Sequence, residues 1–543
     1  MATQLLDVFG FLSVLLRGGA LAMTSLVLGG VAFTLWVLLP VRYNARADAA
    51  WESCRRLMFR SAAALVLVHV CQVAADSAIL SATTGLGLRQ VTGANFFLAG
   101  AGAICAAIVI AAMTMRRAWR PVPLMLLPAA VLLGALVMTS HAVGRLDHRP
   151  ALIMLTALHQ AATAAWVGAM PYLLLSMGRG GGANIAQTLC RRFSIMAIAS
   201  VAVLVASGAG MSIEYVGSAS AIYGTSYGAM VASKVVLLGF LLFLGGFNLL
   251  IVRQHPVMSA WLLPSLRRFA ETEVGIGFTV ILTAASLTSQ PPAADLPSGR
   301  VTAAEIVQRM RPKWPRLDTP ALSSLSPATP LFSDAVTALG PSSFVPGTSY
   351  HPNTPGDIAW SEYNHHWAGL IVLAAGLLAV LANSGVVGWA RHWPLSFLGL
   401  AVFLFLRADP ENWPLGPRSF WQSFAVAEVL QHRVFVVLIV AFAGFEWAVR
   451  TGRIATRLAG FVFPLVCAAG GALLLTHTHQ LGNIKEELLA ELSHIPLAIF
   501  AVAAGWSRWL ELRLAIPQKR VAAWIWPACL VLIGAVLINY RES

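Results

Sequence analysis

Charged residues are scarce in this 543-residue chain, and their scarcity is the most informative feature of its composition. Asp, Glu, Lys and Arg make up 11% of the residues, whereas soluble domains contain roughly 25%. Apolar residues make up 58%, and the mean hydropathy is +0.73. This composition argues against a soluble enzyme and predicts an all-α polytopic membrane helical bundle.

The chain also lacks the motifs of several other protein classes. Its six cysteines include no CxxC pair, which argues against a disulfide framework or a thiolate metal site. It has no GxxxxGK[ST] phosphate loop, so we do not expect an ATP-driven motor. The first apolar run, about Phe11 to Leu39, is too long for a signal-peptide core and should remain as a span. We predict neither an enzyme nor a nucleic-acid-binding protein.

Long apolar runs are what the sequence has in abundance. A membrane span needs about 20 apolar residues, and about fourteen stretches are candidates. They begin near residues 11, 57, 93, 122, 150, 193, 229, 271, 366, 393, 431, 455, 494 and 521. The net charge of +14 lies mostly in alternate loops, for example at Arg42, Arg116, Arg191, Arg267 and Arg450. Because positive charge stays cytoplasmic, both termini are predicted to face the periplasm of a bacterial inner membrane.

One polar stretch divides the spans into groups of eight and six. It is rich in Pro, Ser and Thr, which is typical of a linker, although a periplasmic lid or docking site is the alternative. The predicted parts are an eight-helix membrane domain at 1–290, a periplasmic loop at 291–361 and a His-rich six-helix domain at 362–543.

The thirteen histidines are unevenly distributed on this topology, because most of them fall at the predicted outer face. His69 and His159 are different, since they lie well inside the second and fifth spans. Ionisable groups are costly in hydrocarbon and often mark a pathway or binding site. A lone membrane histidine can also simply bond to a carbonyl of a neighbouring helix, and that alternative stays open.

Helical spacing groups these histidines with other polar or sulfur-bearing residues. His69, Gln72 and Asp76 share one face of the second span, and Arg17 could neutralise Asp76. In the fifth span, His159, Thr163, Trp166 and Met170 form a stripe, and Met138 shares a face with His141. Glu362 precedes His365 and His366 by about one turn, as Glu428 precedes His432.

Imidazole nitrogen suits copper, and thioether sulfur favours Cu(I). The candidate metal ligands are therefore His159, His69, His141, Met138, His365, His366, His432, His477, His479 and His494. The candidate supporting residues are Asp76, Glu362, Glu428, Trp166 and Lys234.

Four blocks of the first half carry a family resemblance. They are LHQAATAAWVGAMPYLL (158–174), RRFSIMAIASVAVLVASGAG (191–210), YGAMVASKVVLLGFLLFLGGFN (227–248) and ETEVGIGFTVILTAASLTSQPP (271–292). In order and spacing they resemble the copper-resistance D (CopD) family over about the first 290 residues. The resemblance implies an eight-helix inner-membrane protein that moves copper, often alongside a periplasmic copper chaperone. It also implies that His159 is a copper ligand, whereas Tyr227, Lys234 and Asn248 match positions of less certain role.

The leading hypothesis is copper transport across the inner membrane for homeostasis or resistance, with uptake favoured over export. One alternative is a redox protein that binds haem b, since such bundles hold haem between paired histidines of facing helices. Another alternative is an assembly factor that delivers copper to a membrane enzyme. The copper oxidation state, Cu(I) or Cu(II), is open.

Overall fold

The computed structural model describes residues 2–41, 48–115, 122–179, 183–254, 262–325, 354–424, 427–476 and 485–542. The chain divides into two compact units, Met1–Ser298 and Gly299–Ser543, which are described separately. The predicted division at 290 and 361 stays a prediction, and part of the 291–361 segment is helical.

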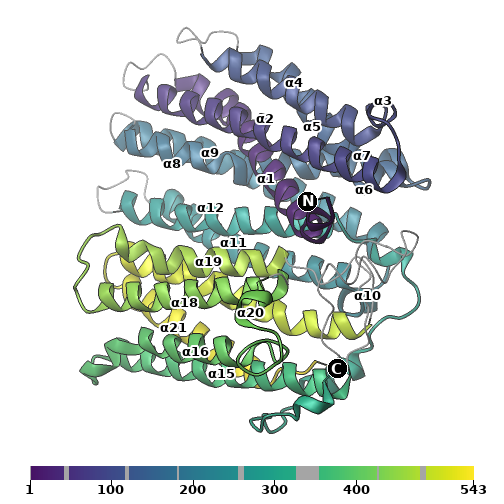
Figure 1. Ribbon diagram of the computed structural model, residues 1–543. Coiled ribbons are helices and arrows are strands. Elements are labelled where there is room, and N and C mark those ends of the chain that lie inside the picture. Colours follow the sequence, from purple (N-terminus) through teal and green to yellow (C-terminus); the bar gives the residue numbers. More distant parts are fainter. Residues whose placement is uncertain are drawn as a thin grey trace. The chain divides into compact units, whose positions relative to one another are not determined.

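The first unit is a bundle of long helices joined by short turns (Figure 1). Its α-helices are α1 (Ala2–Phe33), α2 (Asp48–Thr84), α3 (Leu88–Val91), α4 (Asn95–Met115), α5 (Leu126–Met138), α6 (His141–Gly144), α7 (Arg149–Thr163), α8 (Met170–Arg179), α9 (Ala183–Tyr215), α10 (Ala219–Gly224), α11 (Ser226–Gln254) and α12 (Leu262–Leu287). Its π- and 3₁₀-helices are η1 (Thr34–Leu38), η2 (Leu39–Val41), η4 (Val122–Met125), η5 (Ala164–Gly168) and η6 (Ala293–Asp295).

The second unit is also helical. Its α-helices are α13 (Ala303–Met310), α15 (Pro355–Ser384), α16 (Ser396–Arg407), α17 (Phe420–Ser423), α18 (Ala427–Arg450), α19 (Val462–Thr476), α20 (Lys485–Arg513) and α21 (Gln518–Ile538). Its 3₁₀-helices are η7 (Leu322–Ser324), η8 (Gly388–Leu395) and η9 (Ala459–Phe461).

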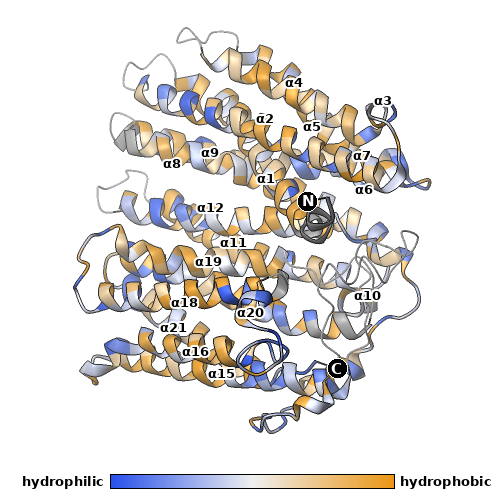
Figure 2. Cartoon of the chain, in the orientation of Figure 1, coloured by the Kyte–Doolittle hydropathy of each residue, from blue (hydrophilic) through white to orange (hydrophobic). Residues whose placement is uncertain are grey.

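Thirteen helices in the described part of the chain are long and apolar enough to cross a membrane. Apolar residues cover most of their length, and hydrophilic residues gather toward their ends (Figure 2). The fourth predicted span is a shorter apolar helix, Pro123–Met138. The predicted all-α, multi-span membrane fold is confirmed.

Small residues set the closest helix contacts of the first unit. A Cβ added at Gly168 would lie 1.9 Å from the carbonyl oxygen of Ser25, and one at Gly29 would lie 2.3 Å from Gly168 C. The backbones of α1 and η5 therefore touch, as in other membrane helix pairs that pack through small residues. α1 also contacts α2, α5, α7, α8 and α12, so it lies at the centre of the unit.

Local capping signals explain where α15 begins and ends. Thr354 accepts a hydrogen bond from the backbone of Asp357, whose carboxylate accepts one from the Thr354 backbone, and Pro355 occupies the first turn. Gly385 ends the helix with φ at 72°, a left-handed conformation that glycine adopts without strain. This start positions His365 and His366 three turns into the helix.

Candidate functional site

A cavity of about 240 Å³ lies inside the first unit. It is lined by the fifth span (η5 and α8) and by α9, α11 and α12. Most of its wall is apolar, and its chemically distinctive lining residues are Trp166, Met170, Cys190, Asn248 and Glu273. The fifth-span residues Trp166 and Met170 are 3% and 1% exposed, so this side of the cavity is buried, whereas Ile198 and Leu242 on its open side are exposed.

Glu273 is the carboxylate of this cavity, and it is only 3% exposed. The amide nitrogen of Asn248 donates to its Oε1, and Asn248 Oδ1 is buried without a hydrogen-bond partner. Within the described residues, no basic side chain forms an ion pair with Glu273. Two residues earlier, Glu271 pairs with Arg268 at 2.5 Å and Arg267 at 3.4 Å. The two glutamates therefore differ in charge compensation although they lie on the same helix.

Gly245 on α11 keeps the space beside Glu273 open. A Cβ at this position would lie 3.3 Å from Glu273 Oε2 and 4.0 Å from the Trp166 ring. The first of these distances is tighter than an ordinary van der Waals contact, so a side chain here would displace the carboxylate. The glycine thus helps to maintain the cavity beside Glu273.

A π-helix interrupts the predicted stripe of the fifth span. Thr163 Oγ1 donates to the His159 carbonyl at 2.8 Å, and η5 follows directly. π-Helical turns are rare and frequently mark functional sites. Here the turn carries Trp166, and both Trp166 and Met170 line the cavity, whereas His159 is not one of its lining residues. The predicted stripe is therefore divided: Trp166 and Met170 lie at the cavity, and His159 lies outside it.

His159 is half-buried in α7, on the part of the fifth span that precedes η5 and the cavity. Its Nδ1 is 3.2 Å from Ser207 Oγ of α9, and a Cβ on Gly208 would lie 3.4 Å from its ring. Lys234 of α11 is close enough to interact with it electrostatically. His159 and Lys234, which were predicted separately from the sequence, thus lie within electrostatic range of each other.

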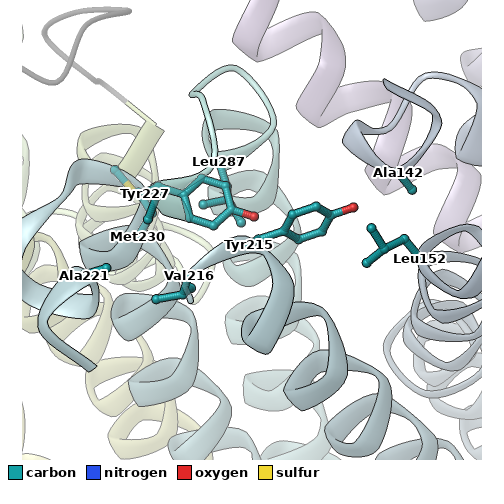
Figure 3. Close-up of a cluster of buried hydrophobic side chains, with 9 residues drawn as sticks. Ala142, Leu152, Tyr215, Val216, Ala221, Tyr227, Met230 and Leu287 are labelled. Atoms are coloured by element: carbon teal, nitrogen blue, oxygen red, sulfur yellow. The ribbon is translucent and has the colours of Figure 1, made fainter. Parts of the chain in front are cut away.

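Aromatic residues close the bundle at the end that contains α6 and α10, called the α10 end below. The rings of Tyr215 and Tyr227 are 6.4 Å apart, edge to face, within a buried apolar cluster (Figure 3). His141 lies 6.3 Å from Tyr215, and Arg145 lies over the same tyrosine ring and pairs with Asp295 at 2.7 Å. Burial lowers the pKa of His141, and its Nε2 is buried without a partner.

Met138 does not join His141. The α5 helix ends at Met138, and Ser140 is extended before α6 begins at His141. The prediction that these two residues share one helical face is therefore wrong, because the helix breaks between them. Met138 is also 45% exposed at the surface of the bundle.

In the second span, His69 and Asp76 are half-buried and Gln72 Oε1 is buried without a partner. Arg17 attracts Asp76 electrostatically. Its guanidinium donates, however, to the Thr288 carbonyl at 3.1 Å and to the hydroxyls of Thr288 and Ser289 at 3.3 Å. Arg17 therefore links α1 to the end of α12 as well as balancing Asp76.

His366 of the second unit is fully buried and engaged on both sides of its ring. The Arg316 backbone N–H donates to Nδ1 at 2.7 Å. Nε2 lies 2.9 Å from the Tyr540 carbonyl oxygen and 2.6 Å from Arg541 Nη1. The ring thus joins α15 to the segment before η7 and to the residues that follow α21, which is a structural role.

His365 and His494 lie beside the same tyrosine. Their ring centroids are 6.0 Å apart, and Tyr540 stacks on His365 at 3.8 Å and lies 5.7 Å from His494. His365 Nδ1 is 2.8 Å from the Ser361 carbonyl oxygen, to which it donates when protonated. Of the predicted histidines of this unit, these two are the pair that the described structure brings together.

The remaining predicted residues are separate. His432 Nδ1 is 2.7 Å from Asp409 Oδ1, and Glu362 pairs with Arg316 at 3.5 Å. His477, His479 and the side chain of Glu428 lie outside the described residues. Over the part of the chain that is described, no three His, Cys, Asp or Glu side chains converge as a metal site.

Two features were missed by the sequence analysis. One is the cavity, whose signal was Glu273, an acidic residue in the apolar run of the eighth span. The other is a buried group of charges in the second unit. There Arg450 pairs with Glu446, Arg508 pairs with Glu511, both at 2.6 Å, and the two arginines lie over the Trp526 ring. This second group is internally neutral and packed among aromatic rings, as expected of a structural network.

Comparison with known proteins points to the same part of the first unit as the cavity. Residues 187–287 match the family described as copper resistance protein D, and this range contains Cys190, Asn248 and Glu273.

A curated relative, "Copper transport protein CutJ" of Bacillus subtilis (strain 168), is 29% identical over 163 residues, which are 30% of this chain and 29% of the relative. The chain therefore matches less than a third of that relative's length. No solved structure matches the chain. The resemblance read from the four sequence blocks is confirmed over residues 187–287, which lie in the first unit and match the copper resistance protein D family. The chain as a whole is a multi-pass membrane protein.

Proposed function

We propose that the first unit transports copper across the bacterial inner membrane, with uptake as the favoured direction. The observation that carries this proposal is the line of polar and sulfur-bearing groups through the unit. It begins at His141 and the two tyrosines of the α10 end, continues to His159, and leads to the cavity with Met170 and Cys190.

The charge distribution orients this line. The cavity lies near the ends of α9, α11 and α12 that carry Arg191, Arg253 and Arg267. Because Lys and Arg stay cytoplasmic, the cavity belongs to the cytoplasmic side and the α10 end to the periplasmic side. Ligand type then changes from imidazole outside to sulfur inside, and sulfur holds Cu(I) more strongly. That gradient supports uptake.

The test is Cu(I) flux into proteoliposomes that contain the purified chain and a trapped Cu(I) indicator. We expect His159→Ala to slow flux by about tenfold or more, because one lost ligand interaction of about 1.4 kcal/mol has that effect. His148→Asn is the matched control, since His148 is an exposed histidine at φ 52°, a conformation that asparagine tolerates. Its flux should equal that of the wild type.

Other outcomes distinguish the alternatives. Copper binding without flux would favour an assembly factor that delivers copper to another protein. A Soret band without copper would favour the haem-binding redox protein. Equal flux in wild type, His159→Ala and empty liposomes would contradict transport.

A further inference from the structure

The cavity of the first unit combines two sulfur atoms with one carboxylate. Its lining includes the thioether of Met170, the thiol of Cys190 and the carboxylate of Glu273. Met170 and Cys190 are 1% and 2% exposed, and they come from the fifth span and from α9. Three separate helices thus present these groups to one space of about 240 Å³.

Glu273 is the second, independent sign of a ligand. An ionised carboxylate buried away from water is costly unless a positive charge or several hydrogen bonds compensate it. Asn248 supplies one hydrogen bond, and its own Oδ1 is buried without a partner. Both residues line the cavity, so a cation placed there would satisfy two oxygen atoms that the protein itself leaves incompletely compensated.

Three arginines of the neighbouring helices contact other groups, and one lysine is distant along its helix. Arg267 and Arg268 pair with Glu271, and Arg17 of α1 donates to Thr288 at the other end of α12. Lys234 precedes Asn248 on α11 by roughly 21 Å at 1.5 Å per residue. Among the described residues, no basic side chain lines the cavity, so a cation bound there can serve as the counter-charge for Glu273.

The lining also indicates which cation. Thioether and thiol sulfur favour Cu(I) over hard divalent ions, which prefer oxygen ligands. Cys190 would bind the ion as the thiolate and release its proton, whereas the Met170 thioether binds as a neutral donor. The softness of the two sulfur donors therefore favours Cu(I).

We propose that this cavity is a binding site for one Cu(I) ion, with sulfur ligands from Met170 and Cys190 and an oxygen ligand from Glu273. This inference rests on the proposed transport function and names the site that receives the cargo on its cytoplasmic side. Asn248 is a positioning residue that orients the carboxylate, and Gly245 maintains the space.

The experiment is equilibrium titration of the full-length chain in detergent and ascorbate, with Cu(I) competed by a chromophoric Cu(I) chelator. We expect the double variant Met170→Leu/Cys190→Ser and the single variant Glu273→Gln each to lose one equivalent of Cu(I) relative to wild type. The sulfur contribution to the copper X-ray absorption spectrum should disappear in the double variant. Zn(II) should not compete for this equivalent.

Two control variants make the same kinds of substitution at residues that do not line the cavity. Glu271→Gln removes a carboxylate that arginines already compensate, and Cys105→Ser removes an exposed thiol of α4. Both should keep the wild-type stoichiometry and sulfur signal. Variants are compared only when they elute as the wild type does and unfold at a similar temperature, and Glu273→Asp provides a second carboxylate variant that should retain binding.

The outcomes separate this inference from transport itself. Unchanged stoichiometry and sulfur signal in both the double variant and Glu273→Gln would overturn the cavity site even if wild-type flux is present. Loss of the equivalent in these variants, with no flux in wild type, would support the site and reject transport. Loss in Glu271→Gln or Cys105→Ser as well would also overturn the assignment.

Discussion

At the scale of single residues, a polar side chain in an apolar helix has two common explanations, a binding role and a joint between segments. His366 and Glu273 illustrate both. The sequence predicts His366 as a metal ligand, but its ring is fully buried and contacts backbone groups on both sides. Glu273 was not singled out from the sequence, yet it lies at the cavity. Residue type alone does not distinguish a binding residue from a structural joint, because the role depends on which residues, often distant in sequence, contact the side chain.

We expect His366→Ala to destabilise the second unit by about 1–3 kcal/mol, since it leaves the Arg316 backbone N–H without its acceptor and removes a fully buried ring. The copper stoichiometry of the chain should not change. Thermal unfolding in detergent and metal analysis of the same preparation measure the two quantities. Copper loss at an unchanged unfolding temperature would instead identify His366 as a ligand.

Some predictions concerned which residues share one face of a helix. These agree with the structure where the helix is regular. Thr163 contacts the His159 carbonyl one turn away, as an α-helix requires. The shared face of Met138 and His141 failed because the helix ends between them. The ligand roles of His69, His159, His432 and the others stay predictions that metal analysis of variants can test.

At the scale of helices, the apolar runs predicted the spans well because each buries a nearly continuous apolar segment in lipid. The interruptions within spans were not predicted. Neither η1 nor η5 has a proline, and the contact that accompanies η5 is between Gly168 and Ser25 of a distant helix. Such a contact is tertiary, so a single sequence carries little signal for it.

Gly168→Ala tests whether this contact fixes the fifth span. The new Cβ would lie 1.9 Å from the Ser25 carbonyl oxygen, which forces α1 and η5 apart. Overpacking of this kind costs roughly 1–3 kcal/mol, so we expect a lower unfolding temperature and slower copper flux. Gly134→Ala on α5 is the control, because a Cβ there meets nothing within 4 Å. Equal stability of the two variants would show that the contact is not required.

At the scale of the whole molecule, the parity of the spans decides whether the two termini lie on the same side of the membrane, and the basic loops decide which side that is. Thirteen helices in the described residues are long enough to cross, and the fourth segment is shorter. Its 3₁₀ part has 4 residues and its α part 13. At about 2.0 and 1.5 Å per residue they reach roughly 28 Å, close to the roughly 30 Å of a bilayer core. This segment is therefore long enough to cross, and with it the described residues would contain an even number of spans.

We accordingly expect both termini on the periplasmic side. The measurement is labelling of intact spheroplasts with a membrane-impermeant thiol reagent, using single cysteines in a chain whose six native cysteines are replaced. Ala2→Cys and Ser543→Cys should react from outside, whereas Thr451→Cys, beside the basic Arg450 and Arg453, should react only after lysis. If one terminus reacts and the other does not, the number of spans is odd. The fourth segment, the shortest of the set, would then be the first one to test for failure to cross, because 13 α-helical residues alone reach only about 20 Å.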